Sequence, residues 1–485
     1  MTAPFFLGVD IGTQGARVVL IDAAGNLIGS EEEDFPLSNQ SREEQSPYAW
    51  WEACMRSLKR LIDEARLRVS VDEIKAVSVT STSGTVIPID VNNEPLHNAI
   101  MYSDKRSAEE GKLCKKVALQ YNNTGYTGFN SSSGLSKMVW YVNHFPEYTE
   151  KISKWIHASD FITGKLSGCW GITDFTNALK SGFDLQNNCW PEYLYNQLPL
   201  KKEWLPMVVA SGTSIGTLDI TVAAQLGLKK TIQVVAGMTD GCASQIASGA
   251  VNLGEWNTTI GTSLVIKGVT KDEIKDPEDR LYSHRHPDGY WMPGGAGNIG
   301  ADWVAQDFKD DLAVLNEQAE QLIPTGKIAY PLRQSGERFP FIAPNAQGFE
   351  EEGLSKPERF AASMEGVAYV ERYAYEMIEK LCGEKVKAVY TAGGGSNSNV
   401  WLTVRSNVLN LPVYKMKYVT GAVGAAILAA SKTHFTTIIE AVQALTQIEK
   451  EIRPQKEWVE KYNQIYHRFL QALQKKGYIK IEAYA

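Results

Sequence analysis

The chain has 485 residues, 44% of them hydrophobic and 22% charged, a composition typical of a globular enzyme of two or three domains. A formal net charge of −7, without a long run of basic residues, argues against nucleic acid as a partner. Six cysteines without a Cys-x-x-Cys spacing predict neither disulfides nor a zinc site, and no apolar stretch is long enough for a membrane helix, so we expect a cytoplasmic protein that does not bind membranes.

The first expected elements are strands around a glycine loop. An apolar strand covers residues 5–10, the loop Gly-Thr-Gln-Gly covers 12–15, and a β-branched strand covers 16–22. Dinucleotide folds and P-loops need such a loop to open a helix, but here a strand follows at once. We therefore expect a β-hairpin, which a third strand over residues 27–35 extends into a meander.

A helix and two more strands complete a first α/β lobe. Ser46 is the expected N-cap and Pro47 the expected first residue of an amphipathic helix that runs to about Arg66. Strands over residues 74–80 and 86–90 then flank a Ser-Thr-Ser-Gly turn.

The second half repeats this plan around another glycine-threonine hairpin. Strands over residues 255–260 and 264–269 flank the turn Gly-Thr-Ser at 261–263. The other expected elements are a strand over 232–236, a small-residue helix over 242–250, a strand over 386–391, a helix over 400–409 and a final helix that packs Trp458, Tyr462, Tyr466 and Phe469. Two such lobes would enclose a cleft for the phosphates of one nucleotide.

Two aspartates lie at the ends of expected buried strands. A carboxylate in that position is costly unless it is paired or near a metal, so we interpret Asp10 as a group that meets Mg²⁺ through water. Asp240 precedes an expected helix, which favours either an N-cap or a general base that takes a proton from a substrate hydroxyl. The two roles of Asp240 are compatible.

Glycine clusters mark further sites of close approach to the backbone. The run of three glycines at 393–395 precedes a Ser/Asn-rich segment, which suits an adenosine pocket, although close packing of the backbone is the alternative. Another cluster covers residues 294–300. His284 and His286 have a spacing that a metal on a strand could use, but no third ligand is apparent, so no metal site is predicted there.

These motifs together resemble the FGGY family of carbohydrate kinases, and the resemblance extends to about Ala430. The segments that carry it are GVDIGTQGARVVLID, SDKR at 103–106, TDFTNALKSGFD at 173–184, GMTDGCASQIASGA at 237–250, TTIGTSL at 258–264 and TAGGGSNSNVW at 391–401. The resemblance implies an α/β fold of the actin-like ATPase type, with two ribonuclease-H-like lobes and a cleft between them. It also implies phosphorylation of a sugar or polyol hydroxyl with ATP and Mg²⁺.

The resemblance assigns parts of the chain to roles. Residues 1–245 would form an N-terminal lobe with the sugar site and the base, residues 246–430 a nucleotide-binding lobe, and residues 431–485 a helical tail. Asp10 and Thr13 would handle metal and transferred phosphate, and Asp240 would be the catalytic base. The nucleotide is expected to contact Gly12, Thr13, Gly261, Thr262, Gly295, Gly394, Gly395 and Asn399. The sugar is expected to contact Ser83, Asp104, Asp240 and Gln14.

The expected sugar is inferred from positions at which this chain differs from members of the family. Xylulokinases carry Met-His where this chain has Thr82-Ser83, and glycerol kinases carry Arg-Glu there. The segment TSTSGTVIPID looks most like the smaller D-ribulose kinases of cyanobacteria and plants, so D-ribulose is the expected substrate, with D-xylulose or another pentulose or polyol as the alternative. Gln14 stands where those kinases tend to have serine, and Tyr102 where many relatives have tryptophan.

Two functions of other classes are weighed against the kinase. An actin-like chaperone-type ATPase would need a further domain after Ala430, where only a short tail follows. A silent sugar-binding regulator would not need Asp10, Thr13 and Asp240 together. The family includes monomers, dimers and tetramers, so a homodimer is one expected assembly.

Overall fold

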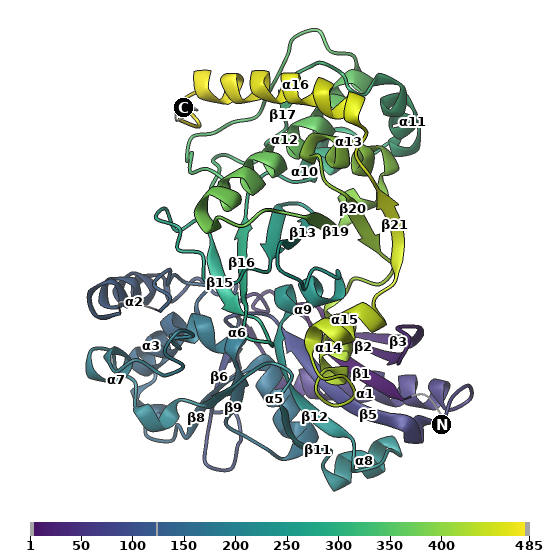
Figure 1. The fold of residues 1–485 in the computed structure, drawn as a ribbon. Coiled ribbons are helices and arrows are strands. Elements are labelled where there is room, and N and C mark those ends of the chain that lie inside the picture. Colours follow the sequence, from purple (N-terminus) through teal and green to yellow (C-terminus); the bar gives the residue numbers. More distant parts are fainter. Residues whose placement is uncertain (1–3, 123–124, 481–485) are drawn as a thin grey trace. The chain divides into compact units, whose positions relative to one another are not determined.

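The computed structural model describes residues 4–122 and 125–480, which divide into two compact units (Figure 1). The first unit comprises the chain to residue 247 together with residues 284–289 and 418–446. The second unit comprises residues 248–283, 290–417 and 447 onward. Each unit is described separately below.

The first unit is built on a six-stranded sheet with the strand order β11-β12-β5-β1-β2-β3. Its strands are β1 (Phe5–Ile11), β2 (Gly15–Asp22), β3 (Leu27–Asp34), β5 (Ile74–Ser81), β11 (Ser214–Thr217) and β12 (Gln233–Thr239). The first three strands pair antiparallel, which confirms the expected meander, and β5 and β12 continue the sheet in parallel. This order places the carboxyl ends of β1, β5 and β12 at one edge of the sheet.

Helix α14 (Gly421–Ala430) packs directly against this sheet, although it is far from it in sequence (Figure 1). A Cβ on Gly8 of β1 would overlap the carbonyl oxygen of Ala422, and one on Gly424 would overlap that of Ala243 in α9 (Asp240–Ala247). Backbone therefore meets backbone, which only small residues permit. Residues 418–446 thus belong to the first compact unit, whereas the expected second lobe extended to residue 430.

The other helices and small sheets of the first unit surround the main sheet. Ser46 caps α1 by accepting the amide of Ala49, and Pro47 is its first residue, as expected. The remaining elements are α1 (Pro47–Ala65), α2 (Ala108–Tyr121), α3 (Gly134–His144), α4 (Pro146–Thr149), α5 (Ala158–Ser167), α6 (Phe175–Ala178), α7 (Tyr193–Asn196), α8 (Ile220–Leu226), α15 (Ile438–Leu445), β4 (Glu44–Gln45), β6 (Val86–Ile89), β7 (Ala99–Ile100), β8 (Lys154–His157), β9 (Ile172–Asp174) and β10 (Met207–Val209). The helix expected over 242–250 begins two residues earlier, at Asp240.

The second unit repeats the same strand order. Its sheet runs β15-β16-β14-β13-β19-β20-β21, so β15 (Tyr282–Arg285) is one strand more than in the first sheet. The pairs among β16, β14 and β13 are antiparallel, and those from β13 to β19 and β20 are parallel. The strands are β13 (Glu255–Ile260), β14 (Leu264–Gly268), β16 (Trp291–Ala296), β19 (Ala388–Ala392), β20 (Val413–Met416) and β21 (Ile448–Ile452). A three-stranded meander followed by parallel strands in both units confirms the expected repeat of two ribonuclease-H-like sheets.

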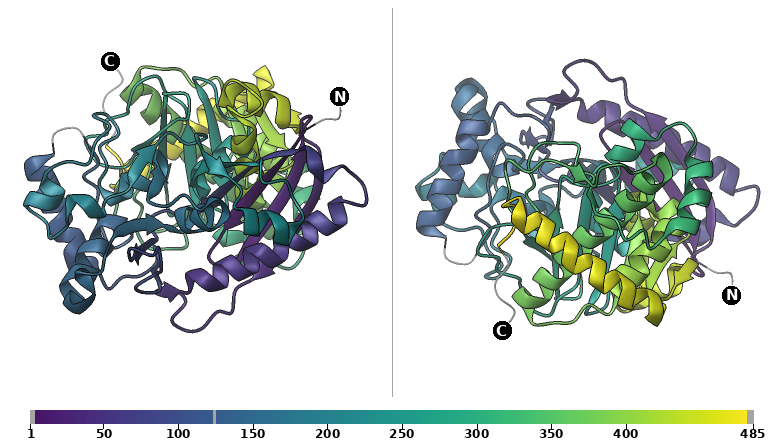
Figure 2. Two further views of the ribbon diagram at one scale, coloured as in Figure 1. Left: turned by 90° about the horizontal axis from the view of Figure 1, so that it is seen from below. Right: turned by 90° about the horizontal axis from the view of Figure 1, so that it is seen from above.

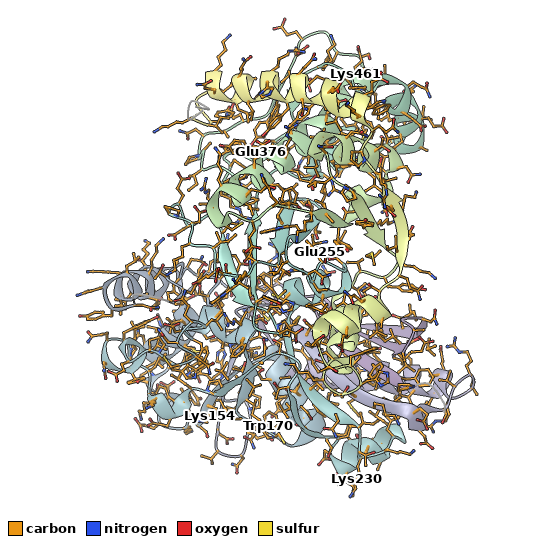
Figure 3. The ribbon with its side chains drawn as sticks, viewed as in Figure 1. Lys154, Trp170, Lys230, Glu255, Glu376 and Lys461 are labelled. Atoms are coloured by element: carbon orange, nitrogen blue, oxygen red, sulfur yellow. The ribbon has the colours of Figure 1, made fainter. Side chains whose placement is uncertain are left out.

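Helices cover the sheet of the second unit (Figure 2). They are α10 (Asp302–Asp307), α11 (Leu312–Leu322), α12 (Lys356–Cys382), α13 (Asn399–Leu409) and α16 (Lys456–Lys475), and the short strands β15 (Tyr282–Arg285), β17 (Ala329–Tyr330) and β18 (Phe349–Glu350) complete the elements. Helix α16 buries Tyr462, Tyr466 and Phe469 and leaves Trp458 partly buried, which confirms the final packing helix. Figure 3 labels Glu376 on α12, whose carboxylate accepts the Tyr466 hydroxyl of α16 at 2.8 Å.

The length and apolar character of the helices bear on membrane insertion. Within residues 4–122 and 125–480, none of them combines the length and apolar character that crossing a bilayer would need.

Candidate active site

Asp10 stands near the carboxyl end of β1, beside Thr80 of β5 in the sheet register. One carboxylate oxygen, Oδ2, lies against the start of α14, because a Cβ on Gly421 would be 2.6 Å from it. A helix N-terminus favours an anion in this position. The other oxygen, Oδ1, is buried and has no hydrogen-bond partner among the described residues. Because Oδ1 has no such partner among the described residues, a cation beside it would satisfy it.

The surroundings of Asp10 make its charge costly. Burial, together with the nearby carboxylate of Asp240, raises the pKa of Asp10 to about 7, although Arg17 opposes the shift. A cation at Oδ1 would relieve this cost. Among the described residues no three His, Cys, Asp or Glu side chains gather as a metal cage, whereas Mg²⁺ typically uses one or two carboxylates with water and phosphate oxygens. The residues fit Mg²⁺ held in that manner.

Asp240 is the first residue of α9, directly after β12. Its Oδ1 accepts the amide of Gly241 at 2.7 Å. Strands β1 and β12 flank β5, so Asp10 and Asp240 come to the same edge of the sheet from opposite sides of one strand. The fold thus brings together the carboxylates of two residues that are 230 positions apart in the sequence.

The loop at residues 12–15 is a tight hairpin turn in which the Gly12 amide donates to the Gly15 carbonyl at 3.0 Å. Gln45 holds the loop by donating a hydrogen bond from Nε2 to the Thr13 carbonyl at 2.9 Å. The Thr13 hydroxyl lies 3.4 Å from the hydroxyl of Tyr102. Gln14 is exposed and anchored through its carbonyl, which accepts the Phe35 amide at 2.8 Å. The backbone of the loop is therefore braced, while the side chain of Gln14 is left to face solvent or a ligand.

Ser83 lies in the turn between β5 and β6, and its hydroxyl is buried without a hydrogen-bond partner among the described residues. The turn is rigid: Thr82 and Thr85 join their hydroxyls at 2.9 Å, and Thr85 Oγ1 accepts the Tyr102 amide at 3.1 Å. Gly84 has φ +85°, and a Cβ there would overlap the carbonyl oxygen of Ser132. A fixed, unpaired hydroxyl of this kind is suited to a hydroxylated ligand.

Asp104 is almost fully buried, and the guanidinium of Arg106 occupies both of its oxygens at 2.7–3.1 Å. Arg106 also contacts Glu44 at 2.7 Å and stacks 4.4 Å from the ring centre of Trp140. A sugar that contacts Asp104 directly would have to displace part of this ion pair. Both partners of this ion pair lie in the motif SDKR at 103–106, and their Asp-x-Arg spacing is the signal in the sequence that could have predicted it.

Lys137 of α3 is a second buried charge that sequence reasoning missed. Its side chain is fully buried, its Nζ donates to the carbonyl oxygen of Ser131, and burial lowers its pKa to about 7. Only the tertiary structure reveals this, because the surrounding apolar helix predicts nothing about the single lysine.

In the second unit, the glycines expected at the nucleotide differ in their surroundings. Positions where a Cβ would meet nothing within 4 Å are Gly261, in the turn between β13 and β14, and Gly394, after β19. By contrast, a Cβ on Gly395 would lie 2.9 Å from Ile260, and one on Gly295 would overlap the ring of Phe339. Packing within the protein therefore explains the glycines at 295 and 395, and open space at 261 and 394 is available to a ligand.

Polar side chains gather at the start of α13. Asn399 is its first residue and accepts Lys450 Nζ through Oδ1, while Asn397 accepts Lys415 Nζ at 3.4 Å. Thr262, expected at the phosphates, is exposed in the turn, and its carbonyl packs against Gly300. The sequence predicted a role for Asn399 but gave no sign of the two lysines, which come from the distant strands β20 and β21.

The family models and several known proteins are similar to this chain. The model described as "FGGY family of carbohydrate kinases, N-terminal domain" matches residues 5–247, and the corresponding C-terminal domain model matches residues 256–433. A xylulose kinase of Staphylococcus epidermidis is 26% identical over 483 residues, which cover 96% of each chain. A gluconokinase of Bacillus licheniformis is 25% identical over 493 residues, which cover 96% of this chain and 95% of the relative. A "xyloylose kinase" crystal structure from Brucella ovis has the same fold, with a TM-score of 0.87 at 23% identity over 98% of this chain and 99% of that one.

Proposed function

Because the chain belongs to the FGGY family of carbohydrate kinases, we propose that it transfers a phosphoryl group from ATP to a hydroxyl of a ketopentose. D-ribulose is the first candidate for this ketopentose. The observation that carries this proposal is the pair of carboxylates at one edge of the first unit's sheet, Asp10 with an unpartnered buried oxygen and Asp240 close enough to raise the pKa of Asp10. Their roles differ because their surroundings differ.

Asp240 is the general base of the proposed reaction. It accepts the proton of the substrate hydroxyl as the hydroxyl oxygen attacks the γ-phosphorus, and the start of α9 stabilises its anionic form before the transfer. General base catalysis of this kind contributes about 10²- to 10⁴-fold, and positioning contributes more.

Asp10 would hold Mg²⁺, through water, with its Oδ1. When bound, Mg²⁺ neutralises charge on the phosphates of ATP. The nucleotide contacts we propose are the backbone of residues 12–15 with Thr13, the turn with Gly261 and Thr262, and the segment of Gly394, Gly395 and Asn399. Backbone amides in glycine turns are suited to phosphate oxygens because no Cβ stands in the way.

The sugar contacts we propose are Ser83, Gln14 and Asp240, with Asp104 acting through Arg106. The buried hydroxyl of Ser83 without a described partner supports a neutral hydroxylated acceptor. D-xylulose is the second candidate, because the relatives that the chain matches at 24–26% identity include several named xylulose kinase. Gluconate is the third, because others are named gluconokinase.

A sugar panel tests the proposal. ADP release is measured with ATP and Mg²⁺ against D-ribulose, D-xylulose, L-ribulose, glycerol and gluconate. We expect the highest kcat/KM with D-ribulose. A higher kcat/KM with D-xylulose or gluconate would identify that sugar as the substrate and leave the proposed reaction unchanged. ATP hydrolysis at a rate that does not depend on any of the sugars would contradict kinase activity and favour an ATPase of another kind.

A further inference from the structure

A buried hydrogen-bond network around Asp174 lies beneath the edge of the sheet that carries Asp240. Asp174 ends β9 and is almost fully buried. Its Oδ1 accepts the amide of Thr176 at 2.7 Å, the hydroxyl of Thr176 at 2.6 Å and the hydroxyl of Ser211 at 3.3 Å. Its Oδ2 accepts Nδ2 of Asn177 at 2.5 Å. Both oxygens of this carboxylate are therefore saturated by neighbouring groups of the protein.

The hydroxyl of Thr176 links Asp174 to the catalytic strand. Thr176 Oγ1 accepts the backbone amide of Thr239 at 2.8 Å, and Thr239 is the residue before Asp240. An amide can only donate and a carboxylate can only accept, so the hydroxyl accepts from Thr239 and donates its own proton to Asp174. The direction of both hydrogen bonds is thereby fixed, and a hydrogen bond to a carboxylate is stronger than one between neutral groups.

The end of β12 follows an irregularity in the pairing of this strand, after which Met238 and Thr239 pair with β5 again. The register of β12 against β5 shifts between Val235 and Met238. A Cβ on Gly237 would overlap the carbonyl oxygen of Val79, so the two backbones approach closely at the irregularity. Beyond it, the amide of Thr239 is held by the side chain of Thr176.

A second arm of the network reaches the turn with Ser83. Asn177 Nδ2 also donates to Ser159 Oγ at 3.1 Å, and the amide of Ser159 donates to Ser81 Oγ at 3.0 Å. Ser81 is the last residue of β5 and leads into Thr82 and Ser83. Asp174 is thus connected through side chains to the strand ends that carry the proposed base and the proposed sugar hydroxyl.

We propose that Asp174 is a positioning residue, which sets the place of Asp240 through Thr176 and that of Ser83 through Asn177, Ser159 and Ser81. The proposal rests on the proposed function of Asp240. Neither Asp174 nor Thr176 touches the reacting atoms. Loss of the first arm displaces the base while the sugar still binds, so it lowers kcat. Loss of the second arm loosens the sugar contact, so it raises KM.

The first arm is tested by Thr176→Val, which keeps the shape of the side chain and removes the hydroxyl. We expect kcat to fall about 10- to 100-fold, the effect of a small misplacement of a catalytic group, with KM for the sugar within about twofold. Thr176→Ser restores the hydroxyl and is expected to keep most of kcat. The matched control is Thr163→Val, a buried threonine in α5 whose hydroxyl donates only to carbonyls of its own helix turn.

The second arm is tested by Ser81→Ala, which removes the acceptor of the Ser159 amide. We expect KM for the sugar to rise about three- to tenfold, with kcat less affected than in Thr176→Val. If Thr176→Val and Ser81→Ala change kcat and KM alike, or if Thr176→Val resembles Thr163→Val, the positioning role is overturned.

Hydrogen exchange gives a readout that needs no activity. Thr176→Val is expected to speed exchange of the Thr239 amide at least about tenfold, with residues of β1 unchanged. Unchanged exchange at Thr239 would overturn the first arm. Asp240→Asn separates this failure from that of the proposed function: turnover retained in Asp240→Asn contradicts the base, whereas loss of turnover there with a fully active Thr176→Val contradicts only the positioning role.

Discussion

Single residues at the edge of the first sheet show how one side chain type acquires two roles. Asp10 is half-buried, its Oδ1 is buried without a described hydrogen-bond partner, and its pKa is raised to about 7. Asp240 lies at the start of a helix and accepts the next amide at 2.7 Å. A cation would stabilise the charged form of Asp10 in its environment, whereas the helix start stabilises Asp240 as an anion that can accept a proton.

Replacement of Asp240 by Asn tests the base. The amide cannot take a proton from the sugar hydroxyl, so we expect kcat to fall by at least about 100-fold with ADP affinity nearly unchanged. Sugar-dependent ADP release measures the first quantity and calorimetric titration with ADP the second. Asp219→Asn, at the N-cap of α8, is the control for the loss of an aspartate at a helix start. Substantial turnover in Asp240→Asn would refute the assignment.

Replacement of Asp10 by Asn should stabilise the fold in a pH-dependent way. The folded-state pKa of Asp10 is raised from 3.8 to about 7, so the folded state keeps a proton that the unfolded chain has already lost, and stability decreases as pH rises between these values. The variant lacks this cost. We expect its stability advantage to grow from about pH 4 to pH 7 and to level off above, at roughly 2–4 kcal/mol.

Urea unfolding in EDTA at several pH values measures this difference, since EDTA removes divalent cations that would stabilise the wild type. Asp63→Asn, at an exposed position of α1, is expected to show no such trend. A stability difference between Asp10→Asn and wild type that does not depend on pH would contradict the prediction.

At the scale of elements, a buried ion pair joins helices α12 and α13 of the second unit. Arg405 donates to both oxygens of Glu371 at 2.7 Å, and neither side chain is exposed. Arg405 also donates to the Thr391 hydroxyl at 2.5 Å, and that hydroxyl donates to the Thr258 carbonyl at 3.2 Å. The pair thereby braces β13 and β19 directly before the glycine run at 393–395.

Breaking this pair should destabilise the second unit strongly. Arg405→Met leaves the carboxylate of Glu371 buried and alone, so we expect a loss of about 3–5 kcal/mol in the free energy of unfolding, measured by urea denaturation. The double variant Glu371→Leu/Arg405→Met removes both charges and is expected to recover much of the loss. If the double variant is less stable than Arg405→Met, the unpaired buried charge of Glu371 is not the cause of the destabilisation in Arg405→Met.

At the scale of the whole molecule, the chain does not complete one unit before beginning the other. The first unit needs residues 418–446, whose helix α14 contacts β1 through Gly8 and α9 through Gly424. Ten consecutive residues of α14 are buried. Without this helix, the apolar face of the sheet around β1 would be exposed.

A fragment of residues 1–247 is therefore expected not to fold alone. Near-ultraviolet circular dichroism should lack the sharp bands of packed aromatic side chains, and a dye that binds apolar surface should bind it. Co-expression with residues 418–446 is expected to increase the soluble, ordered fraction, and a peptide with Gly424→Val should not. An ordered fragment 1–247 without the peptide would contradict the prediction.

The sequence alone determined the meander around the first glycine loop, its repeat in the second half, the cap of α1, the final helix and the family. These features are local: strand and helix periodicity, turn glycines and cap residues depend on neighbours within a few positions. Asp10 and Asp240 were found in the same way, because a charge at the end of a buried strand is costly in any fold.

Only the tertiary structure decided how distant residues meet. It placed Asp10 against Gly421, paired Asp104 with Arg106, joined Asp174 to Thr239 through Thr176, and moved residues 418–446 into the first unit. None of these contacts leaves a periodic signal, because each joins segments whose spacing in the chain is set by the loops between them. The sequence determines which side chains are available to the site, and the packing of strands and helices determines which of them act together.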